Sequence, residues 1–98
     1  MTMDIDWPFA ESRNSAVFTS KRIVFKGDWI YYVTHDLDDG AWQFHPFSGI
    51  TPETEATVVS LEEMVRIDES LRLLSDLPAG WHAWRKSADA AWERSPIE

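Results

Sequence analysis

The segment from Trp29 to Phe47, WIYYVTHDLDDGAWQFHPF, constrains the fold more than any other part of the chain. Two aromatic-rich runs flank an Asp/Gly cluster, a pattern typical of a β-hairpin. We expect Asp39-Gly40 to form a two-residue type I′ turn, because both positions of such a turn favour these residues. Alternation along the strands then places five apolar residues on one face: Tyr31, Val33, Leu37, Trp42 and Phe44.

Further strands are expected on both sides of this hairpin. Ala16–Phe25, AVFTSKRIVF, is rich in β-branched and aromatic residues and predicts one strand or a bent strand. Thr57–Val59 predicts a short strand, and Trp81–Lys86 a final one. Residues 1–14 show no apolar period and are expected to form an irregular arm, and residues 87–98 a loose tail.

Ser60 marks the start of the clearest helix. Ser60 with Glu63 three positions later is a capping box. Apolar residues then recur at spacings of three and four, as in a helix packed on a sheet: Leu61, Met64, Ile67, Leu71 and Leu74. Asp68 is also able to cap a second short helix, so a break there is the alternative to one continuous helix. Residues 77–80, Leu-Pro-Ala-Gly, end the helical part.

These elements predict a single α+β domain covering residues 1–98. A chain of 98 residues with 44% hydrophobic and 27% charged residues is typical of one globular unit. We expect a mostly antiparallel sheet of four or five strands with the helix, or two short helices, on one face. The predicted core contains Val17, Ile23, Tyr31, Val33, Trp42, Phe44, Val58, Leu61, Met64, Leu71, Leu74 and Trp84.

The charge of the chain restricts the classes of partner that it is expected to bind. Seventeen acids against nine bases give a net charge of −8, which argues against nucleic acid and favours a basic protein partner. The first residues, MTMDIDWPF, are acidic where a signal peptide is basic. No run approaches the roughly 18 apolar residues of a membrane helix. We therefore expect a cytoplasmic protein that does not contact membranes.

No cofactor or metal is expected from the sequence. The chain has no Cys, which removes thiolate ligands and cysteine nucleophiles together. The residues 36–40, DLDDG, superficially suggest a calcium loop, but counting from Asp36 the sixth residue is Ala41 and the twelfth is Phe47. An EF-hand requires Gly and Glu at these positions. The Asp and Gly residues are instead typical of a turn.

The three histidines give no catalytic signature. In the predicted hairpin register His35 faces Phe44 while His45 points to the opposite face, so the two should not converge on one ion. His82 lies between two Trp residues of a predicted strand. Each is expected to be half-buried with one hydrogen bond rather than a catalytic base. GxSxG, Walker and GxGxxG motifs are absent, so no catalytic residue is predicted.

Trp81 and Arg85 form a possible binding platform. On a strand both point one way while Trp84 points the other. Trp84 would then seal the core, and the exposed Trp81 and Arg85 would form a cation–π surface for a partner. The alternative, in which both indoles pack against the helix and the N-terminal arm, is equally compatible with the sequence.

Two aromatic motifs carry a resemblance. HDLDDGAWQF and DLPAGWHAWR resemble the motifs HDxDDGxWQF and DLPxGWxAWR of a group of small bacterial proteins of unknown function. That group resembles a wider uncharacterised domain family, of which some members are catalogued as toxin-immunity proteins. The similarity covers residues 15–85 and implies an α+β architecture without catalysis. Relatives tend to carry Pro where this chain has Glu69, which favours a continuous helix here.

Two functions of different classes follow. The first is a non-catalytic acidic domain, such as an immunity-type inhibitor, that covers a basic site of another protein. Its expected contact residues are Asp36, Asp38, Asp39, Glu62, Glu63 and Glu69, with Trp81 and Arg85 as the alternative surface. The second is a small enzyme or ligand-binding domain with a pocket lined by Trp and His, for which Tyr31, His35 or His82 should converge on one deep pocket.

Overall fold

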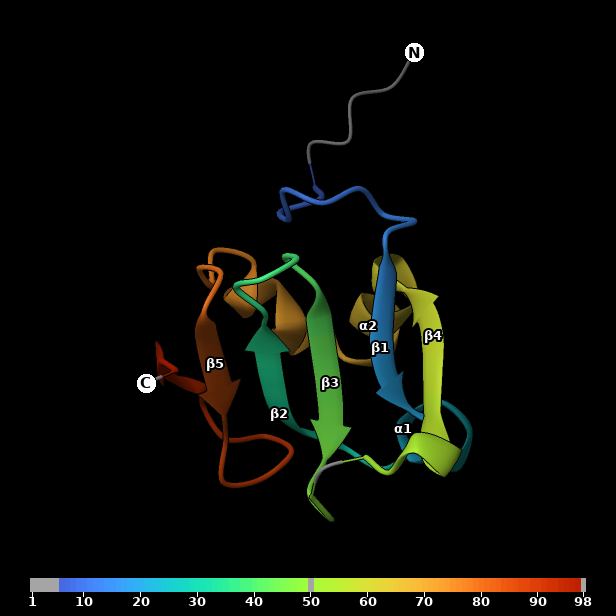
Figure 1. The fold of residues 1–98 in the computed structure, drawn as a ribbon. Helices are drawn as coiled ribbons and strands as arrows, with labels where there is room; N and C mark the ends of the chain where they lie inside the picture. The colour runs from blue at the N-terminus through green and yellow to red at the C-terminus, as the bar shows by residue number, and fades with distance from the viewer. Residues whose placement is uncertain (1–5, 50, 98) are drawn as a thin grey trace.

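The computed structural model describes residues 6–49 and 51–97, which form one six-stranded sheet with helices on one side (Figure 1). The strands are β1 (Ala16–Ser20), β2 (Ile30–His35), β3 (Trp42–Pro46), β4 (Ala56–Ser60), β5 (Trp81–Trp84) and β6 (Glu93–Pro96). Their order is β4-β1-β3-β2-β5-β6, and all neighbours are antiparallel except β1 and β3. The α+β class is confirmed, with six strands rather than four or five.

Four short helical segments join these strands. They are α1 (Lys21–Lys26), η1 (Glu53–Glu55), α2 (Leu61–Ile67) and η2 (Glu69–Leu74), of which η1 and η2 are 3₁₀ helices. In Figure 1 the sheet faces the viewer and α2 lies behind it. The core fills the space between the sheet and these helices, where Val33, Phe44, Leu61 and Met64 are all fully buried.

The predicted turn of the β2–β3 hairpin is wrong. His35 pairs with Trp42, and the Asp36 amide then donates to the Ala41 carbonyl, so the four residues 37–40, rather than two, form the loop. A type I′ turn requires positive φ at both central residues, but among the described residues only glycines, including Gly40 at 71°, have positive φ. A shift of two residues in one strand keeps each side chain on its face, so Trp42 and Phe44 are still buried.

An irregularity in β2 changes which aromatic residue is buried. The pairing of β2 with β3 shifts register between Ile30 and Tyr32. Such a bulge turns the strand, so that Ile30 takes the core position. Ile30 is fully buried, while Tyr31 is half-buried and contacts the exposed ring of Phe47 at 5.0 Å. The prediction of Tyr31 in the core is therefore wrong.

The predicted strand Ala16–Phe25 divides at Ser20 into β1 and α1. The hydroxyl of Ser20 accepts a hydrogen bond from the Arg22 amide, and Gly27 ends α1 with φ 77° and an amide bonded to the Arg22 carbonyl. These are the usual N-cap and C-terminal glycine signals. They outweigh the β propensity of the Ile-Val-Phe run, so the second half of the strand prediction is wrong.

The helical region breaks at Asp68, and the continuous helix favoured by Glu69 is wrong. Ser60 caps α2 through the Glu63 amide, as the capping box predicts. Asp68 has extended backbone, with φ −144°, and its carboxylate accepts a hydrogen bond from the Ser70 amide at the start of η2. The break turns the chain so that Leu71 and Leu74 of η2 also reach the core.

Two further core predictions are wrong because the side chains of β4 and β5 alternate in the opposite phase to the one expected. Val58 pairs with Phe18 on the face without helices and is 53% exposed. Trp84 pairs with Tyr32 on that same face and is half-buried, whereas Ala83 occupies the core position. The other predicted core residues, apart from Tyr31, are buried: Val17, Ile23, Val33, Trp42, Phe44, Leu61, Met64, Leu71 and Leu74.

The two ends of the chain differ in structure. In the predicted arm, residues 6–14 contain neither helix nor strand, and Phe9 is buried against Trp42 with ring centroids 5.5 Å apart. The predicted loose tail is contradicted, because Glu93–Pro96 forms β6 beside β5. Residues 1–5 of the arm, Ile50 and Glu98 lie outside the described residues.

Candidate functional site

The loop at the end of the β2–β3 hairpin forms the most pronounced hollow among those described, of about 350 Å³. Backbone hydrogen bonds assemble it from three distant segments: the Gly80 amide donates to the His35 carbonyl, and the Ile97 amide to the Gly80 carbonyl. The hollow is lined by Asp36, Leu37, Asp38, Asp39, Gly80 and Ile97. Three of the predicted contact residues are thus brought together with two apolar side chains.

Leu37 is the apolar centre of this loop. It is 73% exposed, because the four-residue loop removes it from the sheet face on which it was expected. Gly80 has φ 87°, and a Cβ atom at this position would meet the side chain of Leu37 at 3.6 Å. Ile97 is also exposed. Leu37 and Ile97 are thus two exposed apolar side chains that line the same hollow.

The carboxylates around Leu37 lack cationic partners. The Asp36 carboxylate accepts a hydrogen bond from the Gln43 amide at 2.7 Å, and that of Asp39 accepts one from the Ala41 amide at 2.9 Å. In the part of the chain that the structure describes, neither these carboxylates nor Asp38 forms an ion pair. Their charges are therefore fully available to a cation from outside the chain.

The predicted acids of the helical region are placed differently. Glu62 pairs with Arg13 at 2.7 Å, Glu63 with Arg66 at 2.6 Å, and Glu69 with Arg72 at 2.9 Å. A hollow of about 150 Å³ lies between Glu62, Glu69 and the N-terminal arm. The one acidic surface expected from the sequence is therefore divided, and its helical half is balanced by arginines.

The predicted exposed platform of Trp81 and Arg85 is contradicted. Arg85 is only 2% exposed, and its guanidinium donates to the Ile30 carbonyl, the Ser70 hydroxyl and the Asp68 carboxylate, the last at 2.6 Å. It stacks on the ring of Trp92 at 4.2 Å. Trp81 is half-buried and packs against the core. The prediction assigned the alternating side chains of β5 to the wrong faces, because Trp81, Ala83 and Arg85 share the face that the helices cover.

The Arg85 network joins the sheet to the helix break. Burial alone would raise the pKa of Asp68, but hydrogen bonds from Ser70 and Arg85 and the charge of Arg85 hold that pKa below its usual range. Trp92 adds a hydrogen bond from its indole nitrogen to the Ser70 hydroxyl at 3.0 Å. This cluster has a structural role, and no sequence pattern pointed to it because its members are separated by loops.

His35 and His45 lie on opposite faces of the sheet, as expected, whereas His45 and His82 both contact Tyr32. His35 lies on the covered face, stacked on Trp42 at 4.1 Å, with Nδ1 2.7 Å from the Leu77 carbonyl oxygen. His45 and His82 lie on the face of the sheet without helices. His82 Nδ1 is 2.7 Å from the Tyr32 hydroxyl. No histidine lines either of the two hollows described above.

Tyr32 and His45, on the face of the sheet without helices, have shifted pKa values. Burial raises the pKa of the Tyr32 hydroxyl, and the charge of Asp36 adds to this effect. Burial lowers the pKa of His45, although the same Asp36 charge opposes the shift. His45 is therefore uncharged near neutral pH. Within residues 6–49 and 51–97, no three His, Cys, Asp or Glu side chains gather as metal ligands would.

The chain was compared with family models, curated proteins and solved structures. No family model, no curated protein and no solved structure matches it. The resemblance carried by the hairpin and by the Asp76–Arg85 motif therefore stays a prediction. Among the described residues, no helix combines the length and the apolar character that a membrane span requires.

Proposed function

We propose that this protein is a non-catalytic binding domain that captures a basic protein partner at the end of the β2–β3 hairpin, as an immunity-type inhibitor would. One observation carries the proposal: Leu37 is exposed at the centre of three aspartates that have no cationic partner among the described residues. An apolar anchor surrounded by unpaired charge suits a protein surface, since the anchor supplies affinity and the charges speed encounter and select the partner.

The hairpin end is favoured over the helical acids because of their pairing. A partner cation at Glu62 would have to displace Arg13, whose distance from the Glu62 carboxylate is 2.7 Å. A cation beside Asp38 displaces only water. The loop is also held by backbone hydrogen bonds at both ends, between Asp36 and Ala41 and between Asp36 and Gly40, so binding orders little of the chain.

Affinity capture from the native host tests this proposal. The wild-type protein and the variants Leu37→Asp, Asp38→Lys and Glu53→Lys would each serve as bait, followed by mass spectrometry of the retained proteins. Glu53 is the matched control, because it is exposed in η1, away from the hairpin end, and undergoes the same change of charge.

The expected result is a basic protein retained by wild type and Glu53→Lys but lost from the two loop variants. Circular dichroism verifies that every bait is folded. Retention of the same partner by all four baits would contradict the hairpin end as the binding surface, and so would a retained partner without basic character.

A further inference from the structure

The two edges of the sheet differ in how they are protected. In the order β4-β1-β3-β2-β5-β6, the end strands β4 and β6 each pair on one side only among the described residues. In Figure 1, β4 forms the right-hand edge of the sheet. A free edge carries backbone N–H and C=O groups that can pair with another extended chain, so proteins usually protect it with charged residues, Pro or a bulge.

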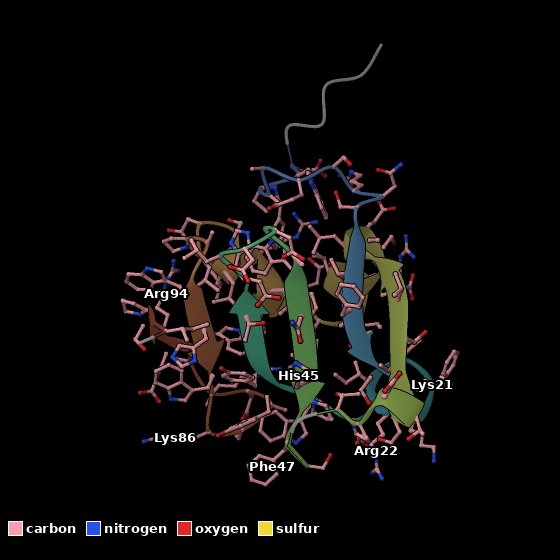
Figure 2. The ribbon with its side chains drawn as sticks, in the orientation of Figure 1. Lys21, Arg22, His45, Phe47, Lys86 and Arg94 are labelled. Carbon is pink, nitrogen blue, oxygen red and sulfur yellow. The ribbon has the colours of Figure 1, made fainter. Side chains whose placement is uncertain are left out.

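The edge at β6 has this protection. The Ile97 amide donates to the Gly80 carbonyl. Since hydrogen-bonded positions alternate along an antiparallel pair, the backbone groups of Arg94 and Pro96 face away from β5. Pro96 has no amide hydrogen to offer a further strand, and Arg94 adds a charged side chain, which Figure 2 shows at the left-hand side of the sheet.

The edge at β4 has none of these devices. Its sequence, Ala-Thr-Val-Val-Ser, contains neither a charged residue nor Pro. All five residues pair with β1 in one unbroken register, so no bulge interrupts the strand. Charged residues lie beyond its ends, and Figure 2 shows Lys21 and Arg22 near the lower end of β4. Arg22 is paired there with Glu55 at 3.0 Å. A strand paired along β4 would therefore bury no charge of β4 itself.

The direction of the backbone groups of β4 follows from its pairing with β1. The Leu61 amide donates to the Ser15 carbonyl, in line with the register of the two strands. Every second residue before Leu61 therefore also bonds to β1, and the residues between them face away from it. The outward-facing residues of β4 are Ala56, Val58 and Ser60.

Four outward groups remain for a further strand. The Ala56 amide donates to the Glu53 carbonyl, and the Ser60 carbonyl belongs to the N-cap of α2, where such a group accepts the first helical hydrogen bond. This leaves the Ala56 carbonyl, the amide and the carbonyl of Val58, and the Ser60 amide. Within residues 6–49 and 51–97 no strand pairs with this side of β4. Groups alternating in this way match the hydrogen bonds of one extended chain.

An apolar pair lies beside these groups. Val58 pairs with Phe18 of β1, and the two residues are 53% and 48% exposed on the face of the sheet without helices. A strand added at β4 would place one of its side chains next to Val58 on this face. Aromatic and β-branched residues form favourable cross-strand pairs with one another, so the edge favours an extended segment with such a residue at its centre.

We propose that β4 is a docking edge at which an extended segment of another protein adds a seventh strand to the six-stranded sheet. Main-chain hydrogen bonds supply the affinity, and the pair of Phe18 and Val58 supplies the side-chain preference, as is usual for strand addition. A second copy of the chain is disfavoured as the occupant, because two molecules of charge −8 repel each other. The proposal does not rest on the function proposed for the hairpin end.

Peptides selected by phage display test this docking edge. Short random peptides are panned against the immobilised wild-type protein, and the most enriched peptide is synthesised for isothermal titration calorimetry. Val58→Pro removes one outward amide at a position where an edge strand tolerates Pro. It should weaken peptide binding by at least about tenfold, equivalent to about 1.4 kcal/mol. Val58→Ala keeps the amide and should weaken binding less. Arg94→Pro is the matched control, because it removes an outward amide from the other edge, and it should leave binding unchanged.

Hydrogen exchange of the wild-type protein reports the binding mode without any variant. The bound peptide should slow exchange of the outward amides of Val58 and Ser60 more than that of Thr57 and Val59, whose amides are already bonded to β1. This alternation is expected from strand addition, whereas a peptide bound elsewhere that only stabilised the fold would slow all four amides alike.

Folding of each variant is verified by circular dichroism, and if Val58→Pro unfolds, the exchange pattern of wild type decides. The proposal is overturned if no peptide is enriched, if the peptide binds Val58→Pro as tightly as wild type, or if Arg94→Pro weakens binding equally. Uniform slowing of the four β4 amides would also overturn it. So would sedimentation of wild type as a dimer and of Val58→Pro as a monomer, since a second copy would then occupy the edge.

Discussion

At the scale of single residues, Trp42 shows how one side chain supports both the core and the loop of the β2–β3 hairpin. Its ring is 2% exposed and contacts Phe9, Phe44 and His35, with His35 stacked at 4.1 Å. His35 in turn accepts the Gly80 amide through its carbonyl group, so packing around Trp42 reaches the hollow beside Leu37.

Two substitutions of Trp42 distinguish the contribution of its volume to stability from that of its indole nitrogen. Trp42→Ala should lower the free energy of unfolding by about 3–5 kcal/mol, the usual cost of removing a buried large aromatic residue. Trp42→Phe should cost much less, because the indole nitrogen has no hydrogen-bond partner among the described residues. Urea denaturation measures both values. Equal losses in the two variants would show that the nitrogen is bonded after all.

Two residues make stability depend on pH in separate windows. Burial lowers the pKa of His45 below its ordinary 6.5, and hydrogen bonds lower that of Asp68 below its ordinary 3.8. In both cases the unfolded chain binds the proton more readily, so stability falls as the pH falls. The loss due to His45 begins near pH 6.5, and the loss due to Asp68 begins only near 3.8.

The pH dependence is measured as the urea midpoint of wild type, His45→Gln and Asp68→Asn from pH 7 to pH 3. His45→Gln should reduce the loss between pH 7 and 5 but leave the acid limb unchanged. Asp68→Asn should be less stable than wild type at pH 7 and flatter below pH 4. Parallel curves for all three proteins would contradict these assignments.

At the scale of elements, the sequence predicted what depends on local patterns. The Ser60 cap and the β2–β3 hairpin depend on residues that are close in the sequence, and both are present. The division at Ser20 had local signals too, Ser20 and Gly27, but the intervening Ile-Val-Phe run has the opposite propensity. At Asp68 the local cap on the Ser70 amide competes with the continuing apolar stripe, and the contact with Arg85, seventeen residues away in the chain, is one that no local pattern reveals.

The candidate site was predicted only in part for a similar reason. Asp36, Asp38 and Asp39 share a turn, so their proximity follows from the sequence. The arginine partners of the helical acids include Arg13, which lies forty-nine residues from Glu62. The exposure of Leu37 depends on a loop two residues longer than expected. Tertiary pairing and register, rather than composition, determine which acids are free.

The strand β6 leads to the opposite expectation from a loose tail for the effect of truncating the C-terminus. Truncation after Lys86 removes β6 and Trp92, which stacks on Arg85 and donates to Ser70. We expect the truncated chain to lose cooperative thermal unfolding, since the buried guanidinium then faces water. Trp92→Ala should be milder, at about 2 kcal/mol, because this ring is only half-buried. An unchanged melting temperature after truncation would show that β6 contributes nothing.

At the scale of the whole molecule, charge is distributed unevenly between unpaired and paired acids. Encounter with a basic partner should therefore respond to the hairpin end alone. With the captured partner, Asp38→Lys should slow association by about tenfold at low salt, and about 0.5 M salt should reduce the difference because exposed charges are screened. Stopped-flow or surface binding kinetics give the rates.

Glu53→Lys again serves as the control for net charge, since the two variants have the same total. If both slow association equally, the partner senses the overall charge of −8 rather than the loop. If neither does so and salt has no effect, the aspartates serve solubility, and contact through Leu37 and Ile97 alone would have to explain binding.

The parallel contact between β1 and β3 has a consequence for the order in which the sheet assembles. Only six residues, 36–41, separate β2 from β3, whereas β1 pairs with β4 across more than forty residues, from Ala16 to Ser60. Closing the short loop costs far less chain entropy, so the hairpin should form early and the β1–β4 pair should dock onto its edge last. The same pair should open first under native conditions, and its amides should exchange with solvent deuterium sooner than those of Val33 and Phe44.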